Sequence, residues 1–377
     1  MGASEEELAA WLRLHLTPGV GPRSARALLA AFGLPHNVLG QSDAALAPFL
    51  SAAQLRAVRN PPQELPAVLT ATLRWLEQPG QRVLTLADAA YPSALFALED
   101  PPLLLHVLGR SDAWPAPERC VSVVGSRNPT PQGVLNARQF ARALSERHLC
   151  VVSGLALGID GAAHEGALQG PGGTLAVVGT GLDRVYPKAH KALAHRVAEQ
   201  GWLLSEFSLG TPALAANFPR RNRLIAALGC GTLVVEAALQ SGSLITARQA
   251  AELGREVFAI PGSIHAPQSR GCHALIKQGA KLVESAQDVL EELRLDTAAT
   301  AAPVAAQSTA PAQTPDALTS NALALLQALG HDPVNLDTLL ARTALDAAQV
   351  QATLLNLELD GQVARLPGGL FQRMGSY

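Results

Sequence analysis

Six short apolar segments, each followed by a loop and a helical pattern, constrain the fold of this chain more than any other feature. Segments this apolar suit strands that are buried on both faces, and strands that alternate with helices form a parallel sheet covered by helices. We therefore predict an α/β fold with a Rossmann-like, doubly wound, mostly parallel sheet. The predicted strands lie at 121–124, 150–152, 175–178, 203–204, 233–235 and 257–259.

The segment before this region, residues 1–66, is predicted to be helical. Gly19 and Gly21 favour a tight turn, Pro22 suits the first turn of a helix, and apolar residues then recur with helical period. This pattern resembles a helix-hairpin-helix or SAM-like unit. Such a turn either binds a phosphate through backbone N–H groups or serves packing alone.

The end of the chain is predicted to form a separate winged-helix domain over residues 316–377. Three helical patterns near 318–329, 336–342 and 347–359 precede QVARLPGGLFQR, in which Pro-Gly-Gly favours a β-hairpin. The preceding stretch, TAATAAPVAAQSTAPAQTP, is uncharged and reads as a flexible linker over 297–315. The predicted domains are thus 1–66, 67–296 and 316–377, with the linker before the last.

Composition and charge exclude several classes of protein. With 48% hydrophobic and 16% charged residues among 377, the chain is globular and not disordered. No apolar run reaches the ~20 residues of a membrane span, and the acidic start does not resemble a signal peptide, so we expect a cytoplasmic protein. The net charge is −2, so any binding of nucleic acid must use a local basic patch.

The common catalytic and metal-binding motifs are absent from the sequence. The four cysteines are far apart and none forms a C-x-x-C pair, so zinc fingers and redox motifs are not expected. The sequence also lacks the Walker G-x-x-x-x-G-K-[ST], G-x-S-x-G and H-E-x-x-H patterns, and GSRNPTPQG does not match a dinucleotide turn. We expect no cofactor, no metal and no catalytic residues. His164 is interpreted as a buried, hydrogen-bonded core residue.

Polar loops follow five of the predicted strands. They contain GSRNPTPQG, SGLALGIDGAAH, GTGLDRVYPKAH, FPRRNRLI and SGSLITA. Because ligands of a doubly wound sheet gather beyond the carboxyl ends of its strands, these loops converge on one edge. Glycines, hydroxyl groups and cations at that edge predict a phosphate-binding surface.

The candidate site residues fall into groups with distinct roles. Hydroxyl groups donate to phosphate oxygens, arginine and lysine supply charge, and glycine lets the backbone approach a ligand closely. Arg220 is expected to be a solvated surface charge, whereas Asp160 and Thr246 either line the site or only begin helices. The candidates are Gly125, Ser126, Arg127, Ser153, Gly154, Lys188, Arg221, Asn222, Arg223, Ser241, Gly242 and Ser243.

Six segments together resemble the DprA/Smf family of DNA-processing proteins. They are VSVVGSRNPTPQG, VVSGLALGIDGAAHEGAL, GTGLDRVYPKAH, FPRRNRLIAAL, VVEAALQSGSLITARQAAELGREVFAIPG and GCHALIKQGAKLV, in that order between about 121 and 283. The helical and winged-helix segments also match the family's layout. Two positions depart from the pattern of the family: Leu157 replaces an arginine, and His190 replaces an asparagine.

The resemblance implies a recombination mediator of natural transformation, not an enzyme. Members of the family bind single-stranded DNA in the pocket described above and load the RecA recombinase past single-strand-binding protein. They also form homodimers through the region of residues 273–290. By position, the resemblance places Leu275 and Ile276 at the dimer interface.

Two alternatives from other functional classes remain at this point. PGGTLAVVG and GCGTLVVEA resemble Rossmann-like nucleotide-processing enzymes of the phosphoribohydrolase type, in which Glu236 would act at the sugar. A transcription factor would use its winged helix to read DNA, but the third helix, in DAAQVQATLLNLELDGQ, carries no lysine or arginine. An interaction or regulatory role therefore suits the winged helix better.

Overall fold

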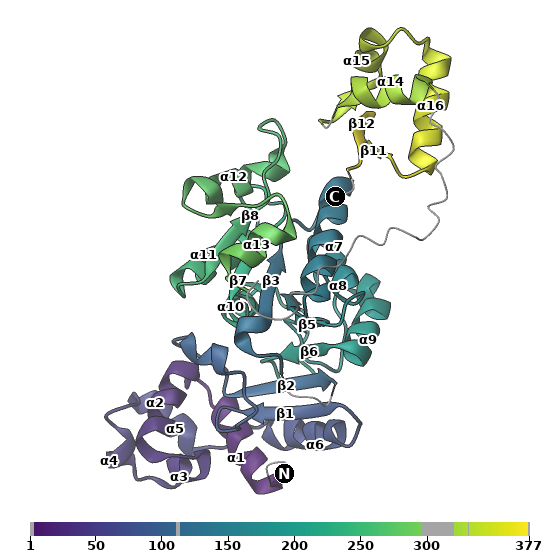
Figure 1. The fold of residues 1–377 in the computed structure, drawn as a ribbon. Helices are drawn as coiled ribbons and strands as arrows, with labels where there is room; N and C mark the ends of the chain where they lie inside the picture. Colours follow the sequence, from purple (N-terminus) through teal and green to yellow (C-terminus); the bar gives the residue numbers. More distant parts are fainter. Residues whose placement is uncertain (1–3, 111–113, 296–319, 331, 376–377) are drawn as a thin grey trace, which may run out of the picture.

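The computed structural model describes residues 4–110, 114–295, 320–330 and 332–375. A helical body at the N-terminus, a central sheet covered by helices and a small C-terminal unit follow one another along the chain (Figure 1). The linker predicted over 297–315, and the residues up to 319, lie outside the described residues.

Nine strands of the described residues form the central sheet, in the order β1-β2-β6-β5-β4-β3-β7-β8-β9. All neighbouring pairs from β6 to β9 are parallel, whereas β1 pairs antiparallel with β2, and β2 antiparallel with β6. The prediction of a doubly wound, mostly parallel sheet is confirmed, and the antiparallel extension was not predicted. The strands are β1 (Gln81–Thr85), β2 (Leu104–Gly109), β3 (Cys120–Val124), β4 (Cys150–Ser153), β5 (Thr174–Val177), β6 (Trp202–Ser205), β7 (Gly231–Val234), β8 (Glu256–Ala259) and β9 (Lys281–Leu282).

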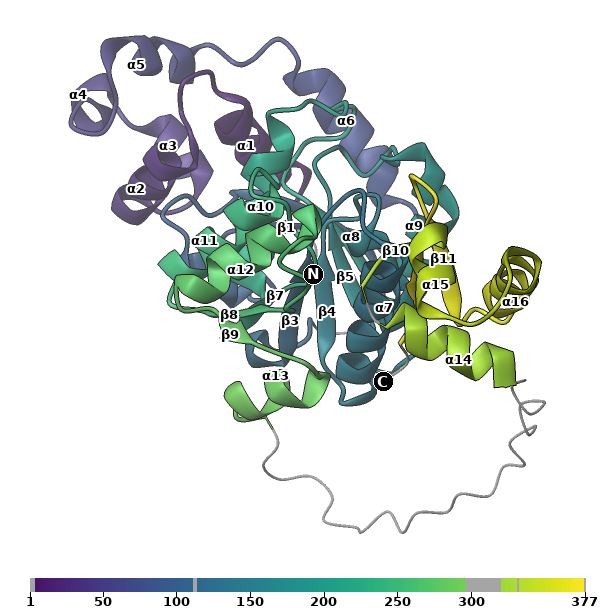
Figure 2. The same ribbon diagram turned by 90° about the horizontal axis from the view of Figure 1, so that it is seen from above.

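Helices cover both faces of this sheet because its strands are apolar on both sides. In β3, Val121 and Val123 join a core with α7, α8 and α13, whereas Cys120 and Val124 join the opposite core with α10, α11 and α12. Figure 2 shows the two helical layers on either side of the strands. The helices are α7 (Pro131–Glu146), α8 (Ile159–Ala167), α9 (Lys191–Gln200), α10 (Asn217–Leu228), α11 (Ser243–Glu252), α12 (Arg270–Lys277) and α13 (Ala286–Glu292), with short 3-10 turns η1 (Ser93–Ala97), η2 (Pro117–Arg119), η3 (Lys188–His190) and η4 (Pro267–Ser269).

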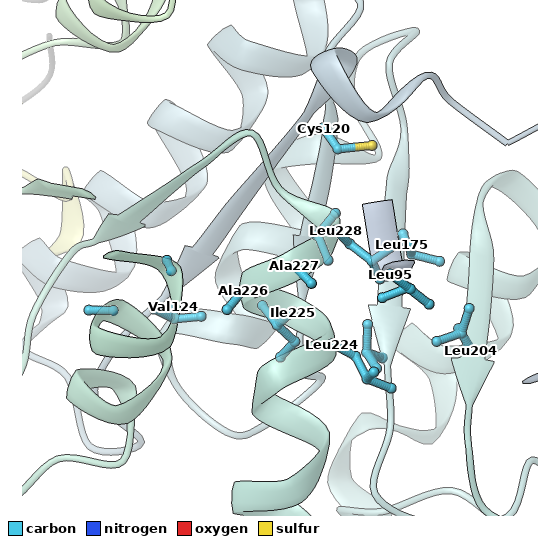
Figure 3. Close-up of a cluster of buried hydrophobic side chains, with 14 of the residues drawn as sticks. Leu95, Cys120, Val124, Leu175, Leu204, Leu224, Ile225, Ala226, Ala227 and Leu228 are labelled. Carbon is cyan, nitrogen blue, oxygen red and sulfur yellow. The ribbon is translucent and has the colours of Figure 1, made fainter. Parts of the chain in front are cut away.

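Helix α10 is the best-buried helix of its layer. Its second half, residues 224–228, packs in one cluster with Val124 of β3, Leu175 of β5 and Leu204 of β6 (Figure 3). Burial of this apolar segment fixes the helix over the sheet, and its polar first half is thereby held at the carboxyl edge.

The N-terminal helices share a core with the edge of the sheet. Helix α6 packs on α1, and Leu103 and Leu104 complete the same apolar cluster from the β2 side. The domain boundary predicted at residue 66 falls in the first turn of α6, and the chain continues from there into β1 and β2. The helices are α1 (Glu5–Leu16), α2 (Pro22–Phe32), α3 (Pro35–Gly40), α4 (Asp43–Leu46), α5 (Ala52–Arg59) and α6 (Leu65–Leu76).

The C-terminal unit has three helices and a hairpin, as predicted, and an apolar core of its own. Among the described residues, three strands pair in the order β10-β12-β11. The elements are α14 (Ser320–Leu329), β10 (Val334–Asn335), α15 (Leu336–Arg342), α16 (Ala347–Leu359), β11 (Val363–Leu366) and β12 (Leu370–Arg373). Across the part of the chain that the structure describes, no helix has the length and apolarity needed to cross a membrane.

Candidate nucleic-acid interface

A pocket of about 480 Å³ lies at the carboxyl edge of the sheet, beside β3 and β7. Strand order reverses there, because β4, β5 and β6 continue from β3 in one direction and β7, β8 and β9 in the other. Such a switch point is where open α/β sheets bind their ligands. The pocket is lined by Val124, Gly125, Ser126, Arg127, Asn128, Ala156, Asp160, Arg221, Asn222, Ile225, Ala238, Gln240, Ser241, Gly242, Ser243 and Thr246.

The lining contains eight of the predicted site residues. They come from the loop after β3, the first half of α10 and the loop before α11, so segments far apart in sequence meet here. The eight are Gly125, Ser126, Arg127, Arg221, Asn222, Ser241, Gly242 and Ser243. The prediction missed three polar or small lining residues: Asn128, which belongs to the GSRNPTPQG loop, Ala238 and Gln240. The lining also includes Asp160 and Thr246, for which the sequence allows either a place in the site or a role at a helix start.

Arg221 is the buried cation of the pocket. Only 3% of its surface is exposed; its Nη1 donates to the carbonyl of Val177 at 2.5 Å, and its Nε has no hydrogen-bond partner among the described residues. Burial lowers its pKa to about 10, which leaves the guanidinium charged at neutral pH. A Cβ at Gly154 would collide with this guanidinium, so that glycine makes room for the arginine.

Asp160 balances part of this charge and orders the neighbouring loop. Its Oδ2 accepts the backbone N–H groups of Gly154 at 3.1 Å and Ala156 at 3.4 Å. Burial raises the pKa of this carboxyl group, and the nearby Arg221 acts in the opposite direction. Two cations, Arg221 and Arg127, act on this one carboxyl group, so the pocket keeps an attraction for anions.

Arg127 lies at the rim of the pocket and is exposed to solvent. Its guanidinium carbon lies 5.5 Å from the centre of the Phe218 ring, within the range of a cation–π contact. The preceding residue is fixed, because Ser126 N–H donates to the Glu236 carbonyl at 2.7 Å, and its Oγ accepts from the Asn128 N–H at 3.1 Å.

The opposite wall is the SGS loop (residues 241–243) and the first turn of α11. The hydroxyl oxygens of Ser241 and Ser243 lie 2.7 Å apart in a hydrogen bond. A Cβ at Gly242 would meet no atom within 4 Å, and its φ of −61° suits any residue, so packing does not require glycine there. The helix N-terminus adds a partial positive charge beside the hydroxyl groups.

Four predicted site residues do not line the pocket. Ser153 is fully buried, and its hydroxyl donates to the carbonyl of Val123 at 2.6 Å, so it ties β4 to β3. Gly154 lies behind Arg221, and Lys188 is exposed at the start of η3, outside the lining. Arg223 is also absent from the lining, because its guanidinium is buried in an ion pair with Glu206.

The ion pair of Arg223 ties α10 to the sheet. Its Nη2 donates to Glu206 at 2.5 Å, and its Nε lies 3.4 Å from Asp100. Burial raises the pKa of Glu206, and Arg223 opposes that rise. Arg220 is half-exposed and lies 3.6 Å from the buried Glu206, so it pairs with that carboxylate and is not solely a solvated charge.

Glu236, which the enzyme alternative would require, closes the start of α7. Its Oε1 accepts the Thr130 hydroxyl at 2.6 Å and its Oε2 accepts the Thr130 N–H at 2.9 Å. The carboxylate packs against Gly133 and is absent from the pocket lining. Burial raises its pKa, and the two bonds from Thr130 lower it.

The predicted dimer residues occupy different environments. Leu275 is only 5% exposed and belongs to the core beneath α12, so little of its surface is available to a partner and its role at a dimer interface stays a prediction. Ile276 is half-buried and retains surface that a partner can contact. No cluster of three or more metal-binding side chains occurs among the residues described by the structure.

Comparison with known proteins identifies the family. The model of the family described as DNA recombination-mediator protein A matches residues 82–294, which is more than half of the chain. The chain belongs to this family. A second model, the DprA winged helix domain, matches residues 309–369. The resemblance read from the six motifs is thereby confirmed.

Relatives of the DprA/Smf family align over most of this chain. Protein Smf of Escherichia coli (strain K12) is 43% identical over 304 residues, which cover 80% of either chain. The crystal structure of DprA from Streptococcus pneumoniae covers 78% of this chain and 99% of its own, with a TM-score of 0.62 and 36% identity. DNA processing protein A from Helicobacter pylori, described for its single-stranded DNA binding mode, covers 57% and 96%, with a TM-score of 0.51 and 30% identity.

Proposed function

We propose that this chain binds single-stranded DNA without strong sequence preference and loads the RecA recombinase onto it during natural transformation and DNA uptake. The observation that carries the proposal is the set of donors that lines one pocket: Arg221 and Arg127 beside the hydroxyl groups of the SGS loop. Phosphate oxygens match this set of donors. The binding mode described for the Helicobacter pylori relative supports the same ligand class.

The proposed contacts are mainly electrostatic and therefore independent of sequence. Arg127 and Arg221 would supply charge, and Lys188 would extend it along the strand outside the pocket. The SGS loop and α11 would donate hydrogen bonds to phosphate oxygens. Arg223 and Ser153 are assigned structural roles, because their polar atoms are used inside the protein.

The direct test is a comparison of labelled single-stranded and duplex oligonucleotides at matched salt. We expect tighter binding to the single strand, and faster RecA assembly on strands covered by single-strand-binding protein when this chain is added. Equal affinity for duplex DNA, or no effect on RecA assembly, contradicts the corresponding part of the proposal.

Homodimer formation belongs to the same proposal. Ile276 on α12 is the predicted interface residue that retains exposed surface. Light scattering should report a dimer for the parent chain and a monomer for Ile276→Glu. A dimer in both proteins moves the interface elsewhere.

The function is proposed to be non-enzymatic. A glutamate acting at a nucleotide sugar needs an available carboxylate, and both oxygens of Glu236 are bonded to Thr130. Incubation with nucleoside monophosphates should release no free base. Release of base at a steady rate would favour the nucleotide-processing alternative.

A further inference from the structure

Aromatic side chains are scarce in this chain, yet two of them meet beside the pocket. Only 4% of the residues are aromatic. The rings of Tyr186 and Phe218 lie 5.5 Å apart between centroids, and Arg127 lies over the second ring at 5.5 Å. We call Tyr186 and Phe218 the stacking ledge, and Arg127 adjoins it from the pocket.

The ledge begins at the rim of the pocket and continues outward along the sheet edge. Arg127 belongs to the pocket lining, Phe218 lies in the first turn of α10, and Tyr186 precedes η3 in the loop after β5. Exposed Lys188 follows Tyr186 by two residues. The two ring contacts therefore order Arg127, Phe218 and Tyr186 outward from the pocket, and Lys188 is a neighbour of Tyr186 in the sequence.

The exposure of Tyr186 calls for a ligand. It is 48% exposed although one side packs on Phe218, which is more than the 38% of Phe49 and the 44% of Phe96, the other exposed rings among the described residues. Every nucleobase has a π-face, so a surface aromatic beside cations binds single strands whatever their sequence. A duplex offers no such face except at its ends.

We propose that Tyr186 stacks on a base of the single strand, next to the nucleotide whose phosphate occupies the pocket. Lys188 then lies beside the following phosphate. This inference rests on the proposed function, which it extends from phosphate contacts to a base contact. The single-stranded DNA would thus run along the sheet edge from the pocket toward η3.

The test uses full-length variants and two labelled oligonucleotides, one ordinary and one with abasic sites throughout. Tyr186→Leu should weaken binding to the ordinary strand about fivefold to 160-fold, the usual range for loss of one base–aromatic stack. Tyr186→Phe should bind like the parent. On the abasic strand, Tyr186→Leu and the parent should bind equally, because no base is present to stack.

Phe49→Leu is the matched control. Phe49 is 38% exposed and pairs with Phe32 at 5.5 Å, but it lies in the N-terminal helices. It should not alter affinity for either strand. Circular dichroism of each variant checks that the fold is retained.

Two results would overturn the ledge: unchanged affinity of Tyr186→Leu for the ordinary strand, or an equal loss on both strands. Arg127→Ala keeps the two proposals apart, because loss of a phosphate contact weakens binding to ordinary and abasic strands alike. If Arg127→Ala loses affinity while Tyr186→Leu does not, only the ledge fails. If neither loses affinity, the proposed site itself fails.

Discussion

At the residue scale, the three arginines of FPRRNRLI have three different environments. Helical geometry turns successive side chains by about 100°, so Arg221 points away from Arg220 and Arg223, which lie three residues apart on one side of α10 and both meet Glu206. Arg221 points into the pocket, Arg223 into a buried ion pair and Arg220 toward the surface. One basic cluster in the sequence therefore serves ligand binding, packing and the surface separately.

The salt dependence of binding should separate these roles. For a single strand, each phosphate contact contributes about −0.7 to the slope of log affinity against log salt. Arg127→Ala should weaken binding to all sequences and flatten the slope by about one contact. Arg220→Ala is the control and should leave the slope unchanged, since this arginine faces Glu206. Titrations at several salt concentrations measure both, and equal effects would indicate diffuse charge.

His164 is a second residue whose environment defines its role. Its Nε2 accepts the Leu155 N–H at 3.2 Å, so in the neutral ring Nδ1 carries the proton and donates to Thr174 Oγ1 at 2.7 Å. Thr174 in turn donates to the Val151 carbonyl at 2.6 Å. Burial lowers the pKa of His164 to about 3. This histidine is a core residue that holds the loop after β4.

That lowered pKa has a consequence for acid stability. The unfolded chain takes up a proton near the ordinary pKa of ~6.5, and the folded chain does not, so the stabilisation is present above that pH and is lost as pH falls toward about 3. At pH 5 the loss is about 2 kcal/mol for this one group. His164→Gln should be less stable than the parent at pH 7 but decline less between pH 7 and pH 5. Thermal unfolding at both pH values measures this, and equal declines would contradict it.

At the element scale, the start of α7 connects the core to the pocket rim. Thr130 caps the helix by accepting the Gly133 N–H at 3.0 Å, and Glu236 from the β7 side holds the same threonine. The loop between β3 and this cap contains Ser126 and Arg127. The position of the pocket rim therefore depends on a helix cap that lies outside the pocket lining.

Thr130→Val should show this dependence. It removes the hydroxyl group that caps α7 and leaves the buried Glu236 short of a donor, which costs about 1–3 kcal/mol of unfolding free energy. Affinity for single-stranded DNA should fall with it, because the pocket rim loosens. Thr130→Ser keeps the hydroxyl group and should therefore keep both the stability and the DNA affinity of the parent. Denaturant unfolding measures the stability of both variants, and DNA titration measures their affinity. Normal affinity in Thr130→Val would show that the helix cap does not position the pocket rim.

How far the sequence predicts such elements depends on the kind of signal. Strands β3 to β8 were predictable, because strands buried on both faces leave short, continuous apolar segments, whereas the two-residue β9 was not predicted. The antiparallel β1 and β2 were not, since an irregular stretch of 86–103 separates them and hides the pairing. The burial of Ser153 and Leu275 was not predictable either, because the sequence letter of a serine or a leucine is the same whether its side chain faces a ligand, a partner or the core.

At the scale of the whole molecule, the winged-helix unit has its own core and touches the sheet domain through few polar contacts. Gln132 of α7 exchanges two hydrogen bonds with the backbone of Gly375, at 2.9 and 3.3 Å. Helix α16 carries no lysine or arginine. Its surface therefore contributes little attraction for phosphate.

A chain that ends at residue 296 should consequently keep most of its affinity for single-stranded DNA. The pocket and the stacking ledge both lie within the remaining residues. Titration of the shortened and full chains with the same oligonucleotide gives the comparison. A loss of more than tenfold would assign DNA contacts to the winged helix.

Strand β2 belongs to two cores at once, since Leu104 packs beneath the N-terminal helices and Leu105 and Val107 pack on the opposite face with the sheet. An exchange of domains between members of the family must respect this arrangement. A junction at residue 66 would cut into α6 and uncover Leu103 and Leu104. The transferred segment should therefore extend to Gly109, where β2 ends. The recipient protein must then offer a β6 edge that pairs antiparallel with this β2.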